Sequence, residues 1–374
     1  MWVDSFSIKL DQSSDIFSTG EVISGRAKFH VSDYLQSDGA YIELIGEGTV
    51  SWCETARYDD DEPRKARTVW YSSSEKYVEQ RIVLIDLPEQ ICEPNYYDFP
   101  FRFLLHNNLP SSFIGKYGKV EYKLRCTIKR PWKLSLKKTL PFSLISPADL
   151  NQITQAQSPI RTVNSKSFGA LFFKSAPLSV KIRVPKTGYV PGDNILVDMF
   201  VDNQSSTSIK SCELILYQKT KFYALEPAEM TKTELRKVYE TKHEGLGARS
   251  IASWLAVPVF VPAVPSSNLT HCNIIQVNYY VKVRLVPVGL SFALESNFDV
   301  IIGTKRLSEA PPQYSQLSRE SSTAPEYNPP QYEPAGPSLV VDNNDELPPA
   351  YSELYDDEEG FHVISNNFEL PYPD

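Results

Sequence analysis

Residues 120–128 alternate between apolar and polar side chains, and this period of two constrains the fold more than any other feature of the sequence. Because successive side chains of a β-strand point to opposite faces, the pattern predicts a strand with one buried and one solvent-exposed face. The same alternation recurs at residues 277–285, and from residue 5 to about residue 303 similar segments follow one another between turn residues. Helical periodicity is almost absent, which predicts an all-β protein.

The two halves of this β region repeat one another. Leu109-Pro-Ser-Ser112 precedes the first alternating strand and Val264-Pro-Ser-Ser267 precedes the second, while turns at residues 18–22 and 190–194 each lead into another strand. This indicates a duplication, and short strands with frequent turns favour two tandem immunoglobulin-like β-sandwich domains. We expect a first sandwich at residues 1–147, an interdomain connection at 148–176, a second sandwich at 177–304 and a tail at 305–374.

The five cysteines are scattered and never form a Cys-x-x-Cys pair, and the histidines lie far apart, so we predict neither disulfides, nor a metal site, nor a cofactor. No apolar run approaches bilayer length and the N-terminus lacks a secretory signal pattern. We therefore expect a cytoplasmic protein with peripheral membrane association only, no nucleic-acid partner, and unused glycosylation sequons at Asn203 and Asn268.

Residues 305–374 differ from the rest of the chain in charge and composition. They hold 14 Asp and Glu against three Lys and Arg, a net charge of -11, and because the whole chain carries -8, residues 1–304 carry +3. Pro, Ser, Glu and Asn replace the apolar alternation there. Such a segment buries too little surface to offset its ordering entropy, so we predict a tail that is disordered when free.

Three Pro-Pro-x-Tyr motifs stand in this tail and are the strongest functional signal of the sequence. Paired prolines favour the polyproline II conformation, which fits the aromatic-lined groove of a WW domain, and the tyrosine fills an adjacent pocket. The alternative, a proline-rich spacer, needs no fixed register. The predicted WW-binding residues are Pro311, Pro312 and Tyr314, then Pro329, Pro330 and Tyr332, then Pro348, Pro349 and Tyr351.

The motifs start 18 and 19 residues apart, which is enough for separate WW domains to bind one tail and raise the avidity. Ala324-Pro-Glu-Tyr327 lacks the first proline and is not predicted as a site. Tyr314 to Leu317 and Tyr351 to Leu354 also match the Tyr-x-x-apolar pattern of sorting signals, which makes clathrin adaptors a further candidate partner.

Several stretches resemble the arrestin domain-containing proteins, also called alpha-arrestins. The resemblance rests on residues 6–10, 42–46, 50–52, 109–113, 118–132 and 146–151 for an arrestin N domain, on 189–193 and 201–203 for an arrestin C domain, and on the tail motifs. It implies an adaptor that links transmembrane cargo proteins to WW-domain ubiquitin ligases of the HECT type, promotes cargo ubiquitination and endocytosis, and is recruited to the plasma membrane and endosomes.

Basic side chains follow the polar face of both duplicated strands. They attract anions, so one hypothesis is a site for a phosphorylated or acidic cargo tail or for inositol lipid head groups, and the alternative is an ordinary solvated strand face. We predict that Trp52, Trp132 and Trp254 are packed in the core. The candidate anion- or cargo-binding residues are Lys123, Arg125, Lys129, Arg130, Lys282 and Arg284, with Lys133 beside them.

Sequence motifs of enzymes are missing, since no nucleophile elbow, P-loop or zinc-protease helix pattern occurs. Two alternatives to the ubiquitination adaptor remain: an arrestin that acts by blocking the cargo surface, and a retromer-like coat subunit. Only the ubiquitination adaptor needs three WW-binding motifs, and it is the function that we predict.

Overall fold

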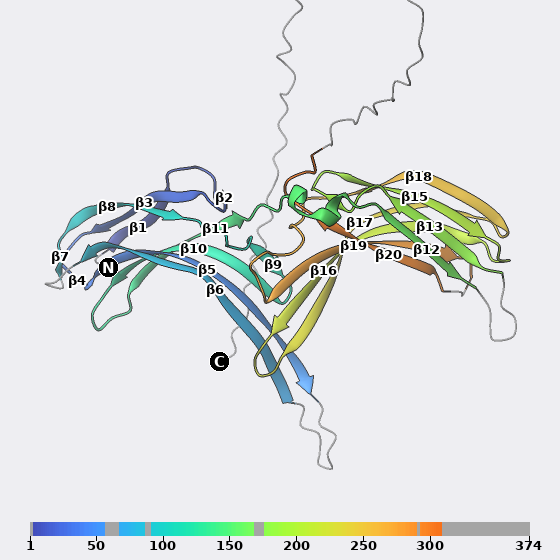
Figure 1. The fold of residues 1–374 in the computed structure, drawn as a ribbon. Coiled ribbons are helices and arrows are strands. Elements are labelled where there is room, and N and C mark those ends of the chain that lie inside the picture. The colour runs from blue at the N-terminus through green and yellow to red at the C-terminus, as the bar shows by residue number, and fades with distance from the viewer. Residues whose placement is uncertain (1–2, 57–66, 87–90, 168–175, 290–291, 309–374) are drawn as a thin grey trace, which may run out of the picture. The chain divides into compact units, whose positions relative to one another are not determined.

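The computed structural model describes residues 3–56, 67–86, 91–167, 176–289 and 292–308, and it is built almost entirely from β-strands. Residues 3–145 form a first sandwich and residues 160–302 a second one (Figure 1). This architecture confirms the predicted all-β fold. Two short 3-10 turns are the only helical elements of the described ranges, and none of these elements is long and apolar enough to cross a bilayer.

The first sandwich has two main sheets and a small ribbon. One sheet has the order β1-β3-β8, with β1 (Val3–Leu10), β3 (Val22–Val31) and β8 (Asn95–Leu104). The other has the order β2-β11-β10-β5-β6, and β9 pairs with β10 beside this path. Its strands are β2 (Ile16–Ser18), β11 (Leu136–Ile145), β10 (Gly118–Lys129), β5 (Gly39–Ala56), β6 (Arg67–Asp86) and β9 (Phe113–Gly115), and the ribbon consists of β4 (Leu35–Gln36) and β7 (Ile91–Cys92).

The second sandwich repeats the strand order of the larger sheet of the first one, in agreement with the predicted duplication. The order β14-β20-β19-β16-β17 matches β2-β11-β10-β5-β6, down to a parallel pairing of the first two strands in each sheet. Its strands are β14 (Gly188–Tyr189), β20 (Leu294–Ile302), β19 (Ile275–Pro287), β16 (Ile209–Ala224) and β17 (Met230–Leu246). The facing sheet consists of β12 (Ile160–Lys166), β13 (Leu178–Val184), β15 (Asn194–Asn203) and β18 (Ser250–Phe260).

The alternation of the sequence becomes the core of each sandwich. In β10 the predicted apolar face from Val120 to Ile128 is buried, and β19 alternates between buried and partly exposed residues along its whole length. Thr127 is an exception to this pattern. The alternation predicts it on the solvent face, but in the structure it is buried and only 1% exposed. It lies in register between Tyr41 on β5 and Lys137 on β11, in the interior of the sheet.

Both sandwiches also contain the same acidic turn, between β2 and β3 in the first and between β14 and β15 in the second. The backbone amide of Ser18 donates to the Glu21 carboxylate over 2.9 Å, and the amide of Val190 donates to the Asp193 carboxylate over 3.1 Å. The residue before each acid is a glycine with positive φ, 87° for Gly20 and 91° for Gly192. That conformation suits glycine because it has no Cβ, which explains the Gly-acid pair in both turns.

The segment between the sandwiches holds the two 3-10 turns, η1 (Leu150–Gln152) and η2 (Thr154–Gln157), and then β12. Leu150 and Ala156 are buried and pack with Val190, which directly follows β14 of the second sandwich. The stretch predicted as interdomain connection, 148–176, thus contributes β12 to the sheet of the second sandwich through its pairing with β13.

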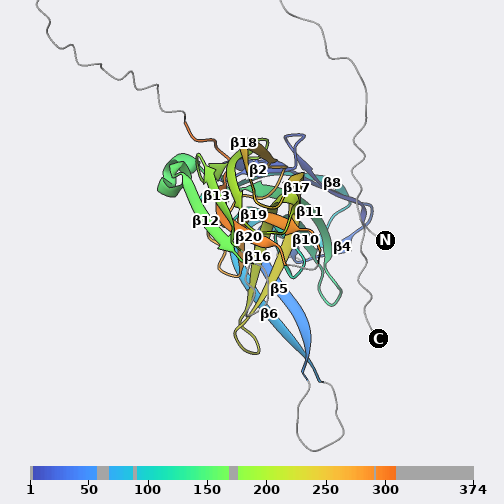
Figure 2. The same cartoon turned by 90° about the vertical axis from the view of Figure 1, so that its right-hand side faces the viewer.

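The strands β5 and β6 form a long hairpin that extends beyond the rest of their sheet (Figures 1 and 2). Its backbone meets the second sandwich where the amide of Ser72 donates to the carbonyl of Glu226 over 2.8 Å. Side chains meet nearby, because Asn273 donates to the Glu75 carboxylate and Lys232 pairs with Glu54 over 2.8 Å. The hairpin is therefore held by polar contacts from the second domain.

Candidate functional site

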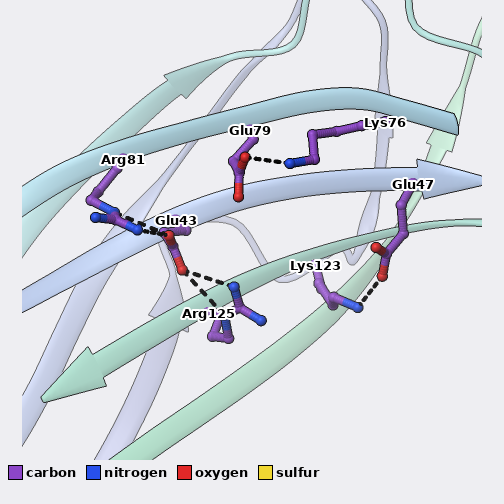
Figure 3. Close-up of polar contacts among 7 residues, drawn as sticks. All are labelled: Glu43, Glu47, Lys76, Glu79, Arg81, Lys123 and Arg125. Atoms are coloured by element: carbon purple, nitrogen blue, oxygen red, sulfur yellow. Dashed lines mark hydrogen bonds and ion pairs between the residues drawn. The ribbon is translucent and has the colours of Figure 1, made fainter. Parts of the chain in front are cut away.

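A buried carboxylate lies at the centre of the outward face of the β10-β5-β6 sheet. Strand register places Glu43 of β5 directly opposite Arg125 of β10 and Arg81 of β6. Arg81 donates to one carboxylate oxygen, with the shorter contact at 2.7 Å, and Arg125 donates to the other, with the shorter contact at 3.0 Å. Figure 3 shows the two guanidinium groups approaching Glu43 from opposite sides.

The two arginines shield Glu43 from water. Its side chain is 1% exposed, whereas the side chains of Arg81 and Arg125 are 50% and 31% exposed. A carboxylate removed from water is stable only when charged donors satisfy both of its oxygens, and here each oxygen has its own guanidinium. The hydrogen bonds to Glu43 raise the pKa of Arg81 above its ordinary value. We call Glu43, Arg81 and Arg125 the first charge cluster.

Lys123 lies two residues before Arg125 on β10, and carboxylates neutralise its charge as well. Its ammonium group contacts Glu47 at 2.6 Å and Glu121 at 3.2 Å. Partial burial opposes the charged form of Lys123, but the hydrogen bonds to the two carboxylates outweigh burial and raise its pKa. Nearby, Lys76 contacts Glu79 at 2.6 Å, and this hydrogen bond lowers the pKa of Glu79 (Figure 3). Cationic and anionic side chains therefore alternate on the outward face of the β10-β5-β6 sheet.

The second domain repeats the arrangement around Glu213 of β16. Register places Glu213 between Arg284 of β19 and Lys242 of β17, as Glu43 lies between Arg125 and Arg81. Arg284 contacts Glu213 at 2.9 Å and Lys242 contacts it at 3.5 Å. We call Glu213, Arg284 and Lys242 the second charge cluster.

Glu295 of β20 adds a second carboxylate beside Arg284. Its oxygens lie 2.9 Å from Lys282 and 2.9 Å from Arg284. The hydrogen bond from Lys282 lowers the pKa of Glu295, although partial burial opposes this shift. Both predicted cations of β19 are therefore ion-paired in the structure.

The structure places the predicted basic residues of β10 and β19 on the solvent side of these strands, as the alternation indicated. It brings Lys123 and Arg125 together on β10, and Lys282 and Arg284 together on β19. Lys129 and Arg130 lie at the end of β10, where the Lys129 ammonium is 5.5 Å from the Tyr41 ring centre and Arg130 donates to the carbonyl of Leu134. Anion binding by these residues stays a prediction.

Sequence reasoning missed the carboxylates at the centres of both clusters. A charged residue inside an apolar strand is the available signal, since Glu43 stands in Ile-Glu-Leu and Glu213 in Cys-Glu-Leu. Their cationic partners Arg81 and Lys242 were also missed, because they lie 38 and 29 residues away and only strand register brings them into contact.

The prediction for the tryptophans is right for two and wrong for one. Trp52 is 4% exposed and stacks on Tyr71 with ring centres 5.9 Å apart, and Trp254 is partly buried against the core. Trp132 is fully exposed. It lies in the turn after β10 with φ of 61°, so it is outside the alternating strand on which the packing prediction depended.

The Pro-Pro-x-Tyr motifs, from Pro311 to Tyr351, lie outside the described residues. The residues that lead into the tail are described and lie against the interdomain segment. Lys305 contacts the Asp149 carboxylate at 2.9 Å, and the amide of Ser308 donates to the side-chain oxygen of Asn151 over 2.7 Å. Residues 304–308 are thus fastened where the two domains join.

Comparison with known proteins agrees with this architecture. Residues 6–151 match the arrestin (or S-antigen) N-terminal domain and residues 174–307 match the arrestin C-terminal domain. Arrestin domain-containing protein 4 of Mus musculus is 25% identical over 374 residues, covering 97% of this chain and 83% of that protein. The protein of the same name from Homo sapiens is 26% identical over 369 residues, covering 97% and 82%.

Arrestin domain-containing protein 1 of Rattus norvegicus is 26% identical over 284 residues, which cover 76% of this chain and 61% of that protein. Arrestin domains are adaptor and scaffold domains and not enzymes. The chain carries two arrestin domains in tandem, and the larger sheet of each has the strand order described above. These domains and relatives show that the chain belongs to the arrestin family, among the arrestin domain-containing proteins or alpha-arrestins.

Proposed function

We propose that this arrestin-family protein is an adaptor for ubiquitination. In this proposal the two sandwiches hold a transmembrane cargo protein, and the three Pro-Pro-x-Tyr motifs recruit a WW-domain ubiquitin ligase of the HECT type. Ubiquitin is then transferred to lysines of the cargo or of the adaptor, which promotes endocytosis and trafficking of the cargo. The protein would act in the cytoplasm and be recruited to the plasma membrane and endosomes.

The observation that carries the proposal is the presence of three motifs in one acidic tail of 70 residues. A single WW contact is weak, but tandem WW domains that bind several motifs of one tail gain avidity through their raised effective concentration. The attachment of residues 304–308 beside Asp149 and Asn151 supports the proposal, because a ligase held by the tail is then tethered near both domains.

Isothermal calorimetry of the full chain with a tandem WW-domain array tests ligase recruitment. The wild type is compared with a variant in which Tyr314, Tyr332 and Tyr351 are changed to Ala. We expect saturable binding by the wild type and its loss in the triple variant. Equal binding by both proteins, or no binding by either, would contradict the proposal and favour the cargo-blocking or coat function.

A further inference from the structure

The turn between β10 and β11, residues 130–135, presents large apolar side chains to solvent. Trp132 is fully exposed and Leu134 is 88% exposed. The Arg130 side chain closes the turn by donating from Nε to the carbonyl of Leu134 over 2.7 Å. Figure 1 shows the loop between β10 and β11 projecting from the end of its sheet. We call residues 130–135 the hairpin tip.

Folding does not account for Trp132 at this position. Its φ of 61° lies in the left-handed region, which is uncommon for residues other than glycine and unfavourable for a bulky side chain. Its exposed ring gains no packing in return, unlike the ring of Trp52 in the core. Trp132 and Leu134 lie two positions apart and are both exposed, and exposed apolar patches mark surfaces that bind a protein or a membrane.

The charges around the hairpin tip indicate what kind of surface it binds. Residues 129–138 include five basic residues and no acidic one, and Lys133, Lys137 and Lys138 are exposed. None of these three lysines forms an ion pair with an acidic residue in the described part of the chain. They differ in this respect from Lys123 and Arg125 on the same strand hairpin, which are neutralised by Glu47 and Glu43.

We propose that the hairpin tip docks the protein on an anionic lipid bilayer. Trp132 and Leu134 insert at the level of the head groups, where tryptophan is favoured because its ring is apolar and its N–H stays hydrated. Lys133, Lys137 and Lys138 contact the acidic head groups, each adding electrostatic attraction. An apolar tip flanked by lysines matches the surface of an anionic bilayer, which has an apolar interior and negatively charged head groups. This docking does not require the ligase or the tail motifs.

Vesicle co-sedimentation of the full chain tests the apolar part of the tip. The wild type should bind vesicles of phosphatidylcholine with phosphatidylserine and not vesicles of phosphatidylcholine alone. The double change Trp132→Ser and Leu134→Ser should weaken binding by about tenfold or more, since burial of large apolar side chains is lost. The matched control is Ile114→Ser, which removes another 88% exposed side chain of the same domain and should leave binding unchanged.

A charge comparison tests the lysines. Changing Lys133, Lys137 and Lys138 to Glu should reduce binding to the level of the neutral vesicles. Changing Lys9, Lys181 and Lys210 to Glu alters the net charge equally at exposed positions away from the tip and should preserve most of the binding. Equal losses in the two triple variants would show a general charge effect and overturn the proposal.

Insertion itself is measured by quenching tryptophan fluorescence with lipids brominated on their acyl chains. We expect quenching in the wild type and its loss in Trp132→Phe, which retains an apolar tip but removes the reporting ring. Quenching that persists in Trp132→Phe would assign insertion to another tryptophan. The proposal is also wrong if the wild type ignores anionic vesicles, or if a soluble acidic peptide binds in a Trp132-dependent way while the vesicles do not.

Discussion

The hydroxyl of Tyr122 donates to the carbonyl of Pro110 over 2.7 Å, and the second domain repeats this bond between Tyr279 and Pro265 over 2.8 Å. The serine two residues after each proline fastens the neighbouring strand, because Ser112 accepts from the amide of Leu144 and Ser267 accepts from the amide of Ile302, each over 2.9 Å. Tyrosine-to-backbone bonds of this kind secure the corners of immunoglobulin-like sandwiches. The duplication therefore preserves individual contacts as well as topology.

We expect Tyr122→Phe to lower the free energy of unfolding of the first domain by about 1 kcal/mol, because the ring stays packed while the buried carbonyl of Pro110 loses its donor. Urea unfolding followed by far-UV circular dichroism measures this change. The control Tyr34→Phe removes the hydroxyl of a tyrosine that is 65% exposed and should be nearly neutral. Equal stability of the two variants would contradict the structural role of this bond.

The first charge cluster should be sensitive to loss of its carboxylate. Glu43→Gln leaves Arg81 and Arg125 without their shared counter-charge, and we expect a loss of about 1–3 kcal/mol in the free energy of unfolding. The loss is below that of a fully buried pair because Arg81 is half exposed and solvent screens its charge.

Glu295→Gln is the matched variant for Glu43→Gln, since its carboxylate also contacts two cations but is 41% exposed. It should change the stability of the second domain by less than about 1 kcal/mol. Thermal unfolding of both variants measures the difference, and a larger effect at Glu295 would show that burial does not set the strength of these clusters.

Anion binding by the first domain should increase when the carboxylates that occupy Lys123 are neutralised. Glu47→Gln with Glu121→Gln frees the Lys123 ammonium while leaving Glu43 in place. We expect a several-fold gain in affinity for a phosphoserine peptide, decreasing as salt is added because screening weakens the attraction. Fluorescence anisotropy measures this, and Glu240→Gln on β17 is the control. An unchanged affinity would favour an ordinary solvated strand face.

The contact that fastens the base of the tail should depend on pH. Hydrogen bonds from Lys305 and Asn151 lower the pKa of Asp149 to about 2. Because this is below the ordinary value of about 3.9, the contact stabilises the folded protein fully above about pH 4 and its contribution is lost as the pH falls toward 2. A carboxyl NMR titration should give a midpoint near the lower value in the wild type. In Lys305→Ala the midpoint should rise, and an unchanged midpoint would contradict the assigned cause.

The avidity of the tail should be graded. Changing one motif tyrosine to Ala should weaken binding of a tandem WW array several-fold, and a second change should weaken it much further, because binding then falls to a single contact. Tyr327→Ala is the matched control, since Ala324-Pro-Glu-Tyr327 lacks the first proline. Calorimetry on the full chain measures both. If Tyr327→Ala lowered the affinity for the WW array as much as the change of a motif tyrosine does, WW domains would not depend on the Pro-Pro pair.

Local patterns in the chain already specify the all-β class, the duplication and the tail motifs. Alternation from Val120 to Ile128 predicts which side of β10 is buried, because side-chain direction depends only on position along a strand. The predicted WW-binding motifs are equally local, since four adjacent residues carry both the paired prolines and the tyrosine on which the prediction rests. The exposed position of Trp132 was beyond this reasoning, because the alternation that predicts burial ends with the strand at Lys129.

Tertiary structure alone decides which charges meet. Alternation correctly places Arg125 and Lys123 on the solvent side of β10 and suggests a basic surface, yet strand register brings Glu43 and Glu47 against them and neutralises both. The partners are separated by 82 and 76 residues, and their contact depends on the pairing of strands distant in sequence. The sequence therefore specifies the face on which each residue lies, and only the folded sheet specifies its neighbour, because direction is a local property of a strand and register is not.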